Sequence, residues 1–285
     1  MERYEALTLD EERALYGLNG AEVVRCLFDG PADGESALKE CRNVHLTDCD
    51  LHLRYPLWHV TDGTLTNCRM TDTCRAALWY DGHLAIRNCE LGGIKALREC
   101  HDITIEGGSA TSTEFGWMCR ELRVRHFSLN SEYPFLHTEN AEFEDLRMKA
   151  KYSFQYTKNL TFRNCTLDTK DAFWHAENVT VYDSVIKGEY LAWYSTNLRL
   201  VRCRIIGTQP LCYCKGLILE DCTMENCDLS FENSDVVATV NGRIDSVKNP
   251  VNGSITADAI GEIILDEHKW PGRCPITVRG KDAIA

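Results

Sequence analysis

Apolar and polar positions along this chain alternate in short runs, and the runs recur at a fixed interval. Four consecutive segments begin 19 residues apart, at Asn159, Asn178, Asn197 and Gly216. The register extends backward through Cys49, with two extra residues near 71–74, and it fades near Gly261. Self-similarity at a fixed period is typical of stacked repeats, here over residues 20–264.

Each repeat is patterned as short strands. In one unit, residues 160–163 alternate apolar and polar, Asn164 interrupts the run, and residues 165–167 resume it. A polar turn over 168–171 leads to a third short strand over 172–176. Three short strands per period, with no helical segment, predict an all-β fold: a single-stranded right-handed parallel β-helix of about 10–12 coils of 19 residues. The Leu/Asn signature of a leucine-rich horseshoe is absent.

Stacking the repeats predicts which side chains face inward. The first apolar column contains Leu84, Ile103, Leu122, Ala141, Leu160, Val179, Leu198 and Leu217. The second contains Ile86, Ile105, Val124, Phe143, Phe162, Val181, Leu200 and Leu219. Asn67, Asn88 and Asn164 lie between strands, where Asn suits a tight turn because it tolerates a left-handed backbone.

The two ends of a β-helix expose unpaired strand edges, so we expect caps there. Residues 1–19 are predicted to cap the N-terminal end, with a short amphipathic helix over Leu9–Tyr16 and Asp10 as its N-cap. Residues 265–285, with the segment Trp270-Pro271-Gly272, are predicted to form a C-terminal cap or tail.

The chain contains 15 cysteines, and the repeat explains most of them. Two stacked columns are rich in cysteine: Cys26, Cys49, Cys68, Cys89, Cys165, Cys203 and Cys222 in one, and Cys41, Cys100, Cys119 and Cys214 in the other. Free Cys behaves as a small buried hydrophobe, so these thiols are predicted to fill narrow corners of the interior. Cys212 and Cys214 are close together, but no second Cys/His pair has zinc spacing, so neither a metal nor a cofactor is expected.

Net charge and apolar content limit the kinds of partner that the chain is expected to have. The 285 residues carry a formal net charge of −12, which argues against a nucleic-acid backbone as partner. No apolar run approaches the ~18 residues of a membrane span, and the first residues lack a signal-peptide pattern. We therefore expect a soluble cytoplasmic chain with reduced thiols and no membrane partner.

The third strand concentrates aromatic residues. One column holds Trp58, Trp79, Trp117, Trp174 and Trp193, together with Arg98 and Gln155. Positions of opposite parity hold most tyrosines, histidines and carboxylates. Because an unpaired buried charge is costly, we expect Trp inside and the Tyr, His, Asp and Glu side chains outside. That assignment buries Arg98 and Gln155 and exposes Leu97, Phe135, Phe154 and Phe173, so the reversed parity stays open.

The aromatic strip suggests two kinds of function. The first is a groove for a sugar or another polyhydroxylated small molecule, whose ring would stack on aromatic faces. Its predicted ligand-binding residues are Tyr133, Tyr152, Tyr156, Tyr190, Tyr194, Tyr213, Lys95, Arg98, Gln155 and Trp174. The second is a non-catalytic scaffold, protein-interaction or oligomerisation module, because aromatic residues also stack in strands for stability alone.

If the chain is an enzyme, the polar members of the strip are its acid–base candidates. We assign proton transfer to Asp171, His175, Glu114 and His137. Chemistry of lyase, epimerase or glycoside-hydrolase type would use such groups. No nucleotide-binding loop, nucleophile elbow or zinc signature is present in the sequence.

The run NLTFRNCTLDTKDAFWHAENVTVYDS, followed by GEYLAWYS, TQPLCYC and DLSFE, resembles an uncharacterised bacterial family. It is family thirty-seven thirty-seven of the domains of unknown function, a pectin-lyase-like β-helix group. The resemblance covers nearly the whole chain and implies a right-handed β-helix in a bacterial cytoplasm. It implies no activity. The wider superfamily contains pectate lyases and polygalacturonases, so a sugar ligand is an analogy at the level of fold.

Overall fold

The computed structural model describes residues 1–30, 35–268 and 271–280. The chain folds as a right-handed parallel β-helix, an all-β solenoid of about 14 turns of ~19 residues. It divides into two compact units, unit 1 (Met1–Glu142 and Leu146–Met148) and unit 2 (Phe143–Asp145 and Lys149–Ala285). The predicted fold class is confirmed, and the predicted 10–12 coils are too few because the repeat pattern fades at both ends before the strands do.

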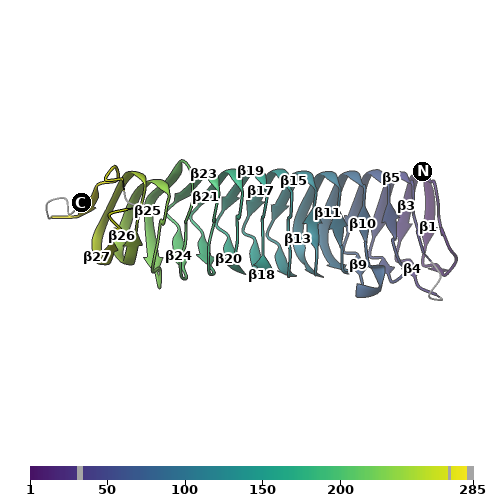
Figure 1. Ribbon diagram of the computed structural model, residues 1–285. Coiled ribbons are helices and arrows are strands. Elements are labelled where there is room, and N and C mark those ends of the chain that lie inside the picture. Colours follow the sequence, from purple (N-terminus) through teal and green to yellow (C-terminus); the bar gives the residue numbers. More distant parts are fainter. Residues whose placement is uncertain (31–34, 269–270, 281–285) are drawn as a thin grey trace. The chain divides into compact units, whose positions relative to one another are not determined.

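Unit 1 has three strand faces, and neighbouring turns pair in parallel within each face (Figure 1). The first face contains β1 (Glu2–Glu5), β3 (Asn19–Val24), β5 (Arg42–Thr47), β8 (Thr61–Thr66), β11 (Gly82–Gly92), β13 (His101–Ser112) and β15 (Arg120–Arg125). The second contains β2 (Thr8–Leu9), β4 (Leu27–Phe28), β6 (Asp50–Leu51), β9 (Arg69–Met70) and β16 (Ser128–Ser131). The third is a small separate sheet of β7 (Leu57–Trp58), β10 (Leu78–Trp79), β12 (Leu97–Arg98) and β14 (Phe115–Trp117).

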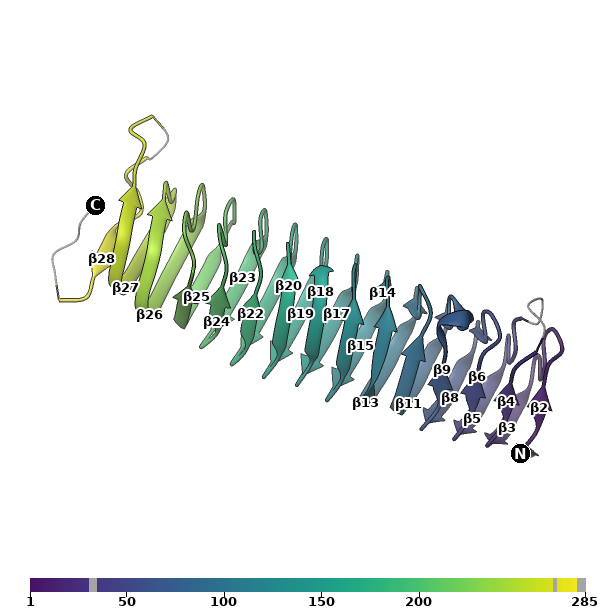
Figure 2. The same ribbon diagram turned by 90° about the horizontal axis from the view of Figure 1, so that it is seen from below.

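Unit 2 repeats the first two faces, and Figure 2 shows its second-face strands one after another. Its first face contains β19 (Lys158–Arg163), β21 (Glu177–Tyr182), β23 (Thr196–Val201), β25 (Leu217–Glu225), β26 (Asp235–Lys248), β27 (Asn252–Ile264) and β28 (Ile276–Val278). The second contains β20 (Thr166–Lys170), β22 (Val185–Lys187) and β24 (Arg204–Ile206). β17 (Glu139–Glu144) and β18 (Arg147–Tyr152) contribute residues to both units.

The predicted interior columns are confirmed. Every member of the two apolar columns is buried, and their registers match the repeat, as in the pairs Leu84↔Ile103 and Leu160↔Val179. The three Asn residues predicted for tight turns all have positive φ, 52° at Asn67, 50° at Asn88 and 53° at Asn164. The 19-residue period therefore places an apolar residue over an apolar residue and a turn over a turn.

The ends differ from the prediction. No helix forms over Leu9–Tyr16, where the chain continues from β2 into turns, and β1 pairs with β3 as a further turn of the solenoid. Near the other end β28 pairs with β27, while Trp270 of the expected C-terminal cap lies outside the described residues. The helix prediction failed because a polar strand can pair through its backbone hydrogen bonds alone, without an alternation of apolar residues to mark it in the sequence. Within the described residues, no helix is long and apolar enough to cross a bilayer.

The eleven cysteines of the two predicted columns are buried in the interior, as predicted, and several of them also donate hydrogen bonds. All fifteen are free and buried. After the left-handed residue Asn164, the thiol of Cys165 donates to the carbonyl of Arg163 at 3.3 Å. Cys203 does the same to Val201 at 3.5 Å, and Ser184 takes this role with its hydroxyl to Tyr182 at 2.6 Å. Small donors thus recur along this column, and each of those named occupies a backbone carbonyl at a corner.

Thiol reactivity should follow this burial. Burial raises the pKa of Cys74 and of Cys212 to about 12, so almost no thiolate forms near neutral pH. We expect a thiol reagent at pH 7.5 to modify few cysteines in the folded chain and nearly all fifteen after unfolding in guanidinium. Rapid modification of more than a few thiols in the folded chain would contradict the corner assignment.

The third segment of each turn is the main correction to the predicted core. Phe135, Phe154 and Phe173 are fully buried, whereas all five tryptophans of the predicted inner column are only half-buried. The Tyr and His positions are the outer ones, as expected, with Tyr156 and Tyr194 45–46% exposed. The predicted interior position of Trp is therefore wrong.

The backbone explains why the parity argument failed. In the segment predicted as a strand over 172–176, alternate residues are left-handed, Phe173 at φ 61° and His175 at 54°, and so is Asp171 directly before it, at 48°. Their N–H groups still donate to neighbouring turns, for example Phe173 to Ser153 at 3.0 Å. The two-residue alternation of side chains holds only for a β-strand. Here the successive residues Ala172 and Phe173 both point inward, and Trp174 is left at the margin.

Candidate functional site

A pocket of about 330 Å³ opens on unit 1, beside its third strand face. Its lining consists of Tyr55, Arg75, Ala76, Trp79, Ile94, Lys95 and Glu114. The set combines two aromatic rings with two cations and one carboxylate. Pockets for small ligands typically have about this volume and a few convergent polar groups on an apolar wall.

The pocket forms where the repeat is interrupted. The two extra residues near 71–74 fold into the 3₁₀ turn η1 (Asp72–Cys74), which Arg75 ends with a left-handed φ of 59°. The hydroxyl of Thr73 donates to the carbonyl of His52 at 2.6 Å, which fixes the extra turn to the coil below. The insertion therefore displaces the chain locally, and the next segment starts with Arg75 on the rim of the pocket.

The adjoining turn is closely packed against Arg75. The N–H of Lys95 donates to the carbonyl of Arg75 at 2.7 Å. Gly93 has φ 109°, and a Cβ at this position would lie 2.6 Å from the same carbonyl oxygen. Only glycine accommodates both the positive φ and this approach, so the backbones that carry Arg75 and Lys95 are held together.

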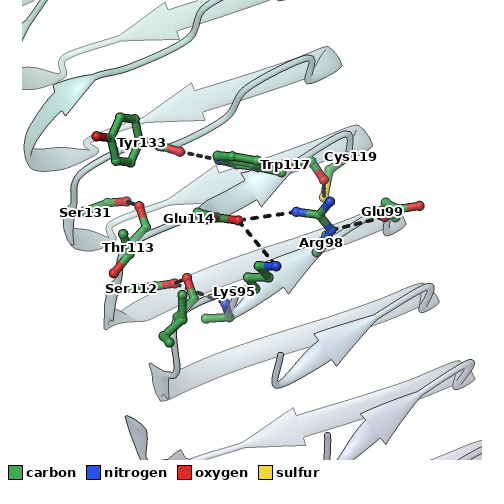
Figure 3. A network of polar contacts seen from close by, with 12 residues as sticks. Lys95, Arg98, Glu99, Ser112, Thr113, Glu114, Trp117, Cys119, Ser131 and Tyr133 are labelled. Carbon is green, nitrogen blue, oxygen red and sulfur yellow. Dashed lines mark hydrogen bonds and ion pairs between the residues drawn. The ribbon is translucent and has the colours of Figure 1, made fainter. Parts of the chain in front are cut away.

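Glu114 lies at the centre of a polar network on the pocket wall (Figure 3). One carboxylate oxygen, Oε2, lies 3.4 Å from Nη1 of Arg98 and 4.0 Å from Nζ of Lys95. Nε of Arg98 donates to Glu99 at 3.1 Å. The Arg98 side chain is only 16% exposed, so this ion pair is partly shielded from water.

The aromatic wall is built by stacking. The rings of Trp58 and Trp79 are parallel to within 10° at 5.4 Å, and Tyr55 is tilted against both at 6.2 and 6.3 Å. The ammonium group of Lys39 lies 4.3 Å from the centre of the Trp58 ring, on which it can make a cation–π contact. Each ring is thus held by its neighbours before any ligand is present.

In the part of the chain that the structure describes, Trp58 and Trp79 of unit 1 lack an indole hydrogen bond that the corresponding tryptophans of unit 2 make. The indole N–H groups of Trp174 and Trp193 each donate to a carbonyl 16 residues further on, those of Tyr190 and Gln209. The indole nitrogens of Trp58 and Trp79 are buried without a partner among the described residues. Other buried polar atoms in this condition include His52 Nε2, Arg54 Nε, Thr61 Oγ1 and Asp81 Oδ2. A buried polar group without a partner is uncommon in a folded protein, and strain, a functional role or a bound water or ion can account for it.

Unit 2 carries a different aromatic feature, an exposed ladder of stacked rings. The rings of Tyr156, His175, Tyr194 and Tyr213 follow one another at 4.8–5.0 Å, with interplanar angles of 5–13°. Ring faces inside the ladder therefore contact each other and cannot stack on a sugar. The ladder presents edges, phenol oxygens and imidazole nitrogens, to its surroundings.

The four acid–base candidates are dispersed. Glu114 lines the pocket of unit 1, and His175 belongs to the ring ladder of unit 2. Asp171 is buried, its Oδ1 has no hydrogen-bond partner in the described part of the chain, and burial raises its pKa. Asp171 and His175, both within the described part of the chain, are not joined by a hydrogen bond. His137 is exposed on unit 1 and is left-handed at φ 54°.

The predicted ligand-binding residues are also divided. Lys95 and Arg98 contact Glu114, and the carbonyl of Tyr133 accepts the indole N–H of Trp117. Gln155 donates to the carbonyl of Asp171 at 3.5 Å, and Trp174 stacks on Trp193. Tyr152 and Tyr190 are half-buried, whereas Tyr156, Tyr194 and Tyr213 form the ladder with His175.

The sequence prediction missed five of the seven residues that line the pocket: Tyr55, Arg75, Ala76, Trp79 and Ile94. One signal could have found them, because the only residues inserted into the otherwise regular stretch of repeats from Cys49 onward lie at 71–74. Ligand sites are commonly built by local departures from a regular scaffold. Within the described residues, no group of three or more His, Cys, Asp or Glu side chains is placed to hold a metal ion.

The fold defines a right-handed parallel β-helix protein. Over residues 2–277 the sequence matches the family described as a protein of unknown function, DUF3737. The chain therefore belongs to this family, as its resemblance indicated. No curated protein matches the sequence significantly.

Several solved structures are similar in fold. The A-module of a mannuronan C-5 epimerase from Azotobacter vinelandii aligns with a TM-score of 0.36 and 10% identity, over 96% of this chain and 89% of that one. Tailspike protein 3 of bacteriophage CBA120 aligns with 0.45 and 9%, over 100% and 58%. An endo-xylogalacturonan hydrolase from Aspergillus tubingensis aligns with 0.30 and 7%, over 94% and 84%. At this identity the likeness concerns the β-helix fold alone.

Proposed function

We propose that the chain binds a carbohydrate or a similar polyhydroxylated small molecule in the pocket of unit 1. The observation that carries the proposal is the juxtaposition of Tyr55 and Trp79 with Arg75, Lys95 and Glu114 around one hollow. Aromatic rings cover the apolar faces of a sugar ring, and charged groups exchange hydrogen bonds with its hydroxyls. The family and the fold are consistent with this proposal and do not name a ligand.

The pocket supports this function better than the ring ladder of unit 2. Ring faces in the ladder already contact one another. In the pocket Trp79 is likewise stacked on Trp58, but Tyr55 is only tilted against both rings and borders an open volume. Among the four acid–base candidates, Glu114 is the one that lines the pocket. It is therefore the group that would exchange a proton with a bound ligand if binding leads to turnover.

Binding is tested by titrating a panel of neutral hexoses and short oligosaccharides by saturation-transfer NMR and calorimetry. Tyr55→Ala removes one aromatic wall, and we expect it to lower the affinity of the sugar that binds best by about tenfold, because an aromatic contact contributes about 0.5–1.5 kcal/mol. Tyr194→Ala is the matched control, because it removes an exposed tyrosine from unit 2 and should leave affinity unchanged.

Two outcomes contradict the proposal. One is equal loss of affinity in both variants, which would place the ligand elsewhere. The other is the absence of binding by the whole panel together with its acidic derivatives, which leaves the interaction module as the remaining candidate. In that case the exposed ladder, with Tyr156 and Tyr194, is the surface on which a protein partner would act.

A further inference from the structure

The charges around the pocket of unit 1 are unequal. Arg75 and Lys95 line it as cations, and Glu114 is the only acidic residue in the lining. Arg98 and Glu99 lie next to this set and pair with each other at 3.1 Å. Three cations therefore face two carboxylates, on a chain whose formal net charge is −12.

Glu114 does not balance the lining cations, because Arg98 already engages it. Its Oε2 lies closer to Nη1 of Arg98, at 3.4 Å, than to Nζ of Lys95, at 4.0 Å. The Arg98 side chain is also the less exposed of the two cations, 16% against 41%. Shielding from water strengthens the Arg98 pair relative to the Lys95 pair, so the charge of Lys95 is only partly compensated.

Arg75 has no ion-pair partner among the residues that the structure describes. Its backbone is held by η1 on one side and by the N–H of Lys95 on the other. A guanidinium offers a planar fork of donors that matches a carboxylate or a phosphate in two parallel hydrogen bonds. The rigid backbone thus places a free anion-binding group on the rim of the pocket.

A ligand that fills the pocket removes water from both cations. A neutral ligand would leave Arg75 desolvated without an opposing charge and Lys95 with only the partial compensation of Glu114, and an unpaired charge is costly to bury. An anionic ligand supplies that charge and turns the cost into attraction. The excess of cations should therefore give the acidic form of a ring a higher affinity for the pocket than its neutral form.

We propose that the ligand carries an anionic group on a polyhydroxylated ring, held by Arg75 and Lys95 while the ring lies against Tyr55 and Trp79. The anion is a carboxylate, as in a sugar acid, or a phosphate, as in a sugar phosphate. This inference rests on the proposed function, because it assigns the charge of the ligand in the same pocket.

The test compares one ring in three forms, glucose, glucuronate and glucose 6-phosphate, by calorimetry and NMR titration. We expect at least one acidic form to bind tenfold or more tightly than glucose at low salt. Raising NaCl from about 20 to about 200 mM should weaken the acidic form several-fold and leave glucose unchanged, because salt screens charge pairs. Whichever acidic form binds more tightly, glucuronate or glucose 6-phosphate, identifies the preferred anion as a carboxylate or a phosphate.

Variants assign the effect to the two cations. Arg75→Gln and Lys95→Met should each reduce the preference for the acidic form to a few-fold or less, and Arg75→Lys should retain part of it. Arg69→Gln is the control, because this exposed arginine of β9 pairs with Glu90 and does not line the pocket. This variant should keep the full preference of the unmodified chain for the acidic form.

The results separate the two proposals. Equal affinity for glucose and both acids overturns the anionic ligand and leaves the sugar pocket in place. A preference for acid that survives Arg75→Gln and Lys95→Met also overturns the inference. If no form of the ring binds, and no neutral sugar of the wider panel binds, both the inference and the proposed function are wrong.

Discussion

Replacing Phe173 by alanine should destabilise unit 2 by about 3–5 kcal/mol, the range measured for large-to-small changes of buried aromatic residues. Phe173 is fully buried, stacks on Phe154 at 5.2 Å and meets the edge of Phe162 at 5.4 Å. Removing the ring leaves a cavity between neighbouring turns that the hydrogen-bonded backbone cannot collapse to fill. Urea denaturation followed by circular dichroism measures the loss.

Two further variants calibrate the result. Phe173→Leu retains most of the buried volume and should lose distinctly less stability, roughly 1–1.5 kcal/mol. Glu177→Ala changes an exposed residue four positions further along the same turn and should stay within about 0.5 kcal/mol of the unmodified chain. If Phe173→Ala costs no more than Glu177→Ala, the phenylalanine column is not part of the core.

The Phe173 prediction concerns the part of the fold that the sequence determined least. The 19-residue period predicted the β-helix and both apolar columns, because a period constrains every stacked position at once. Parity within the third segment could not be predicted from alternation, since alternation assumes extended backbone. A left-handed backbone at a residue such as Phe173 costs conformational free energy. The packing of the neighbouring turns compensates that cost, and the sequence of a single repeat does not show this packing.

The site was harder to predict for a related reason. Lys95 and Glu114 stood out as charges among aromatic residues, whereas Arg75 directly follows the insertion and lies in none of the columns drawn from the sequence. Its place on the rim follows from η1 and from the close approach at Gly93. The 19-residue period predicts the positions that repeat, and it gives no information about the place where the repeat is interrupted.

Asp81 should make the folded chain less stable as the pH rises from about 4 towards neutrality. The residue occupies the interior column of Cys100 and Cys119 and is fully buried. Its Oδ1 accepts the N–H of Val60 at 2.7 Å, and its Oδ2 has no partner in the described part of the chain. Burial raises the pKa of Asp81 well above its usual 3.8, so the folded chain holds the carboxyl in its neutral form.

The sign follows from proton binding. Below pH 3.8 both the folded and the unfolded chain hold the proton, so Asp81 has no effect on the pH dependence. Above that pH the unfolded chain releases the proton and the folded chain retains it, so stability falls by about 1.4 kcal/mol per pH unit. The loss ends at the raised pKa of the folded state, where ionisation of the buried group limits it.

Asp81→Asn keeps the acceptor for the N–H of Val60 and cannot ionise. We expect the variant and the unmodified chain to be similarly stable near pH 4, and the variant to become the more stable of the two as the pH rises towards neutrality. Asp183→Asn is the control, because Asp183 is exposed and its pKa is lowered by its hydrogen bonds with Arg202. Urea titrations from pH 4 to 8 test the prediction. Parallel pH profiles for Asp81→Asn and the unmodified chain would show that Asp81 does not retain its proton on folding. A rising advantage for Asp81→Asn alone would identify Asp81 as a buried acid that the solenoid keeps neutral.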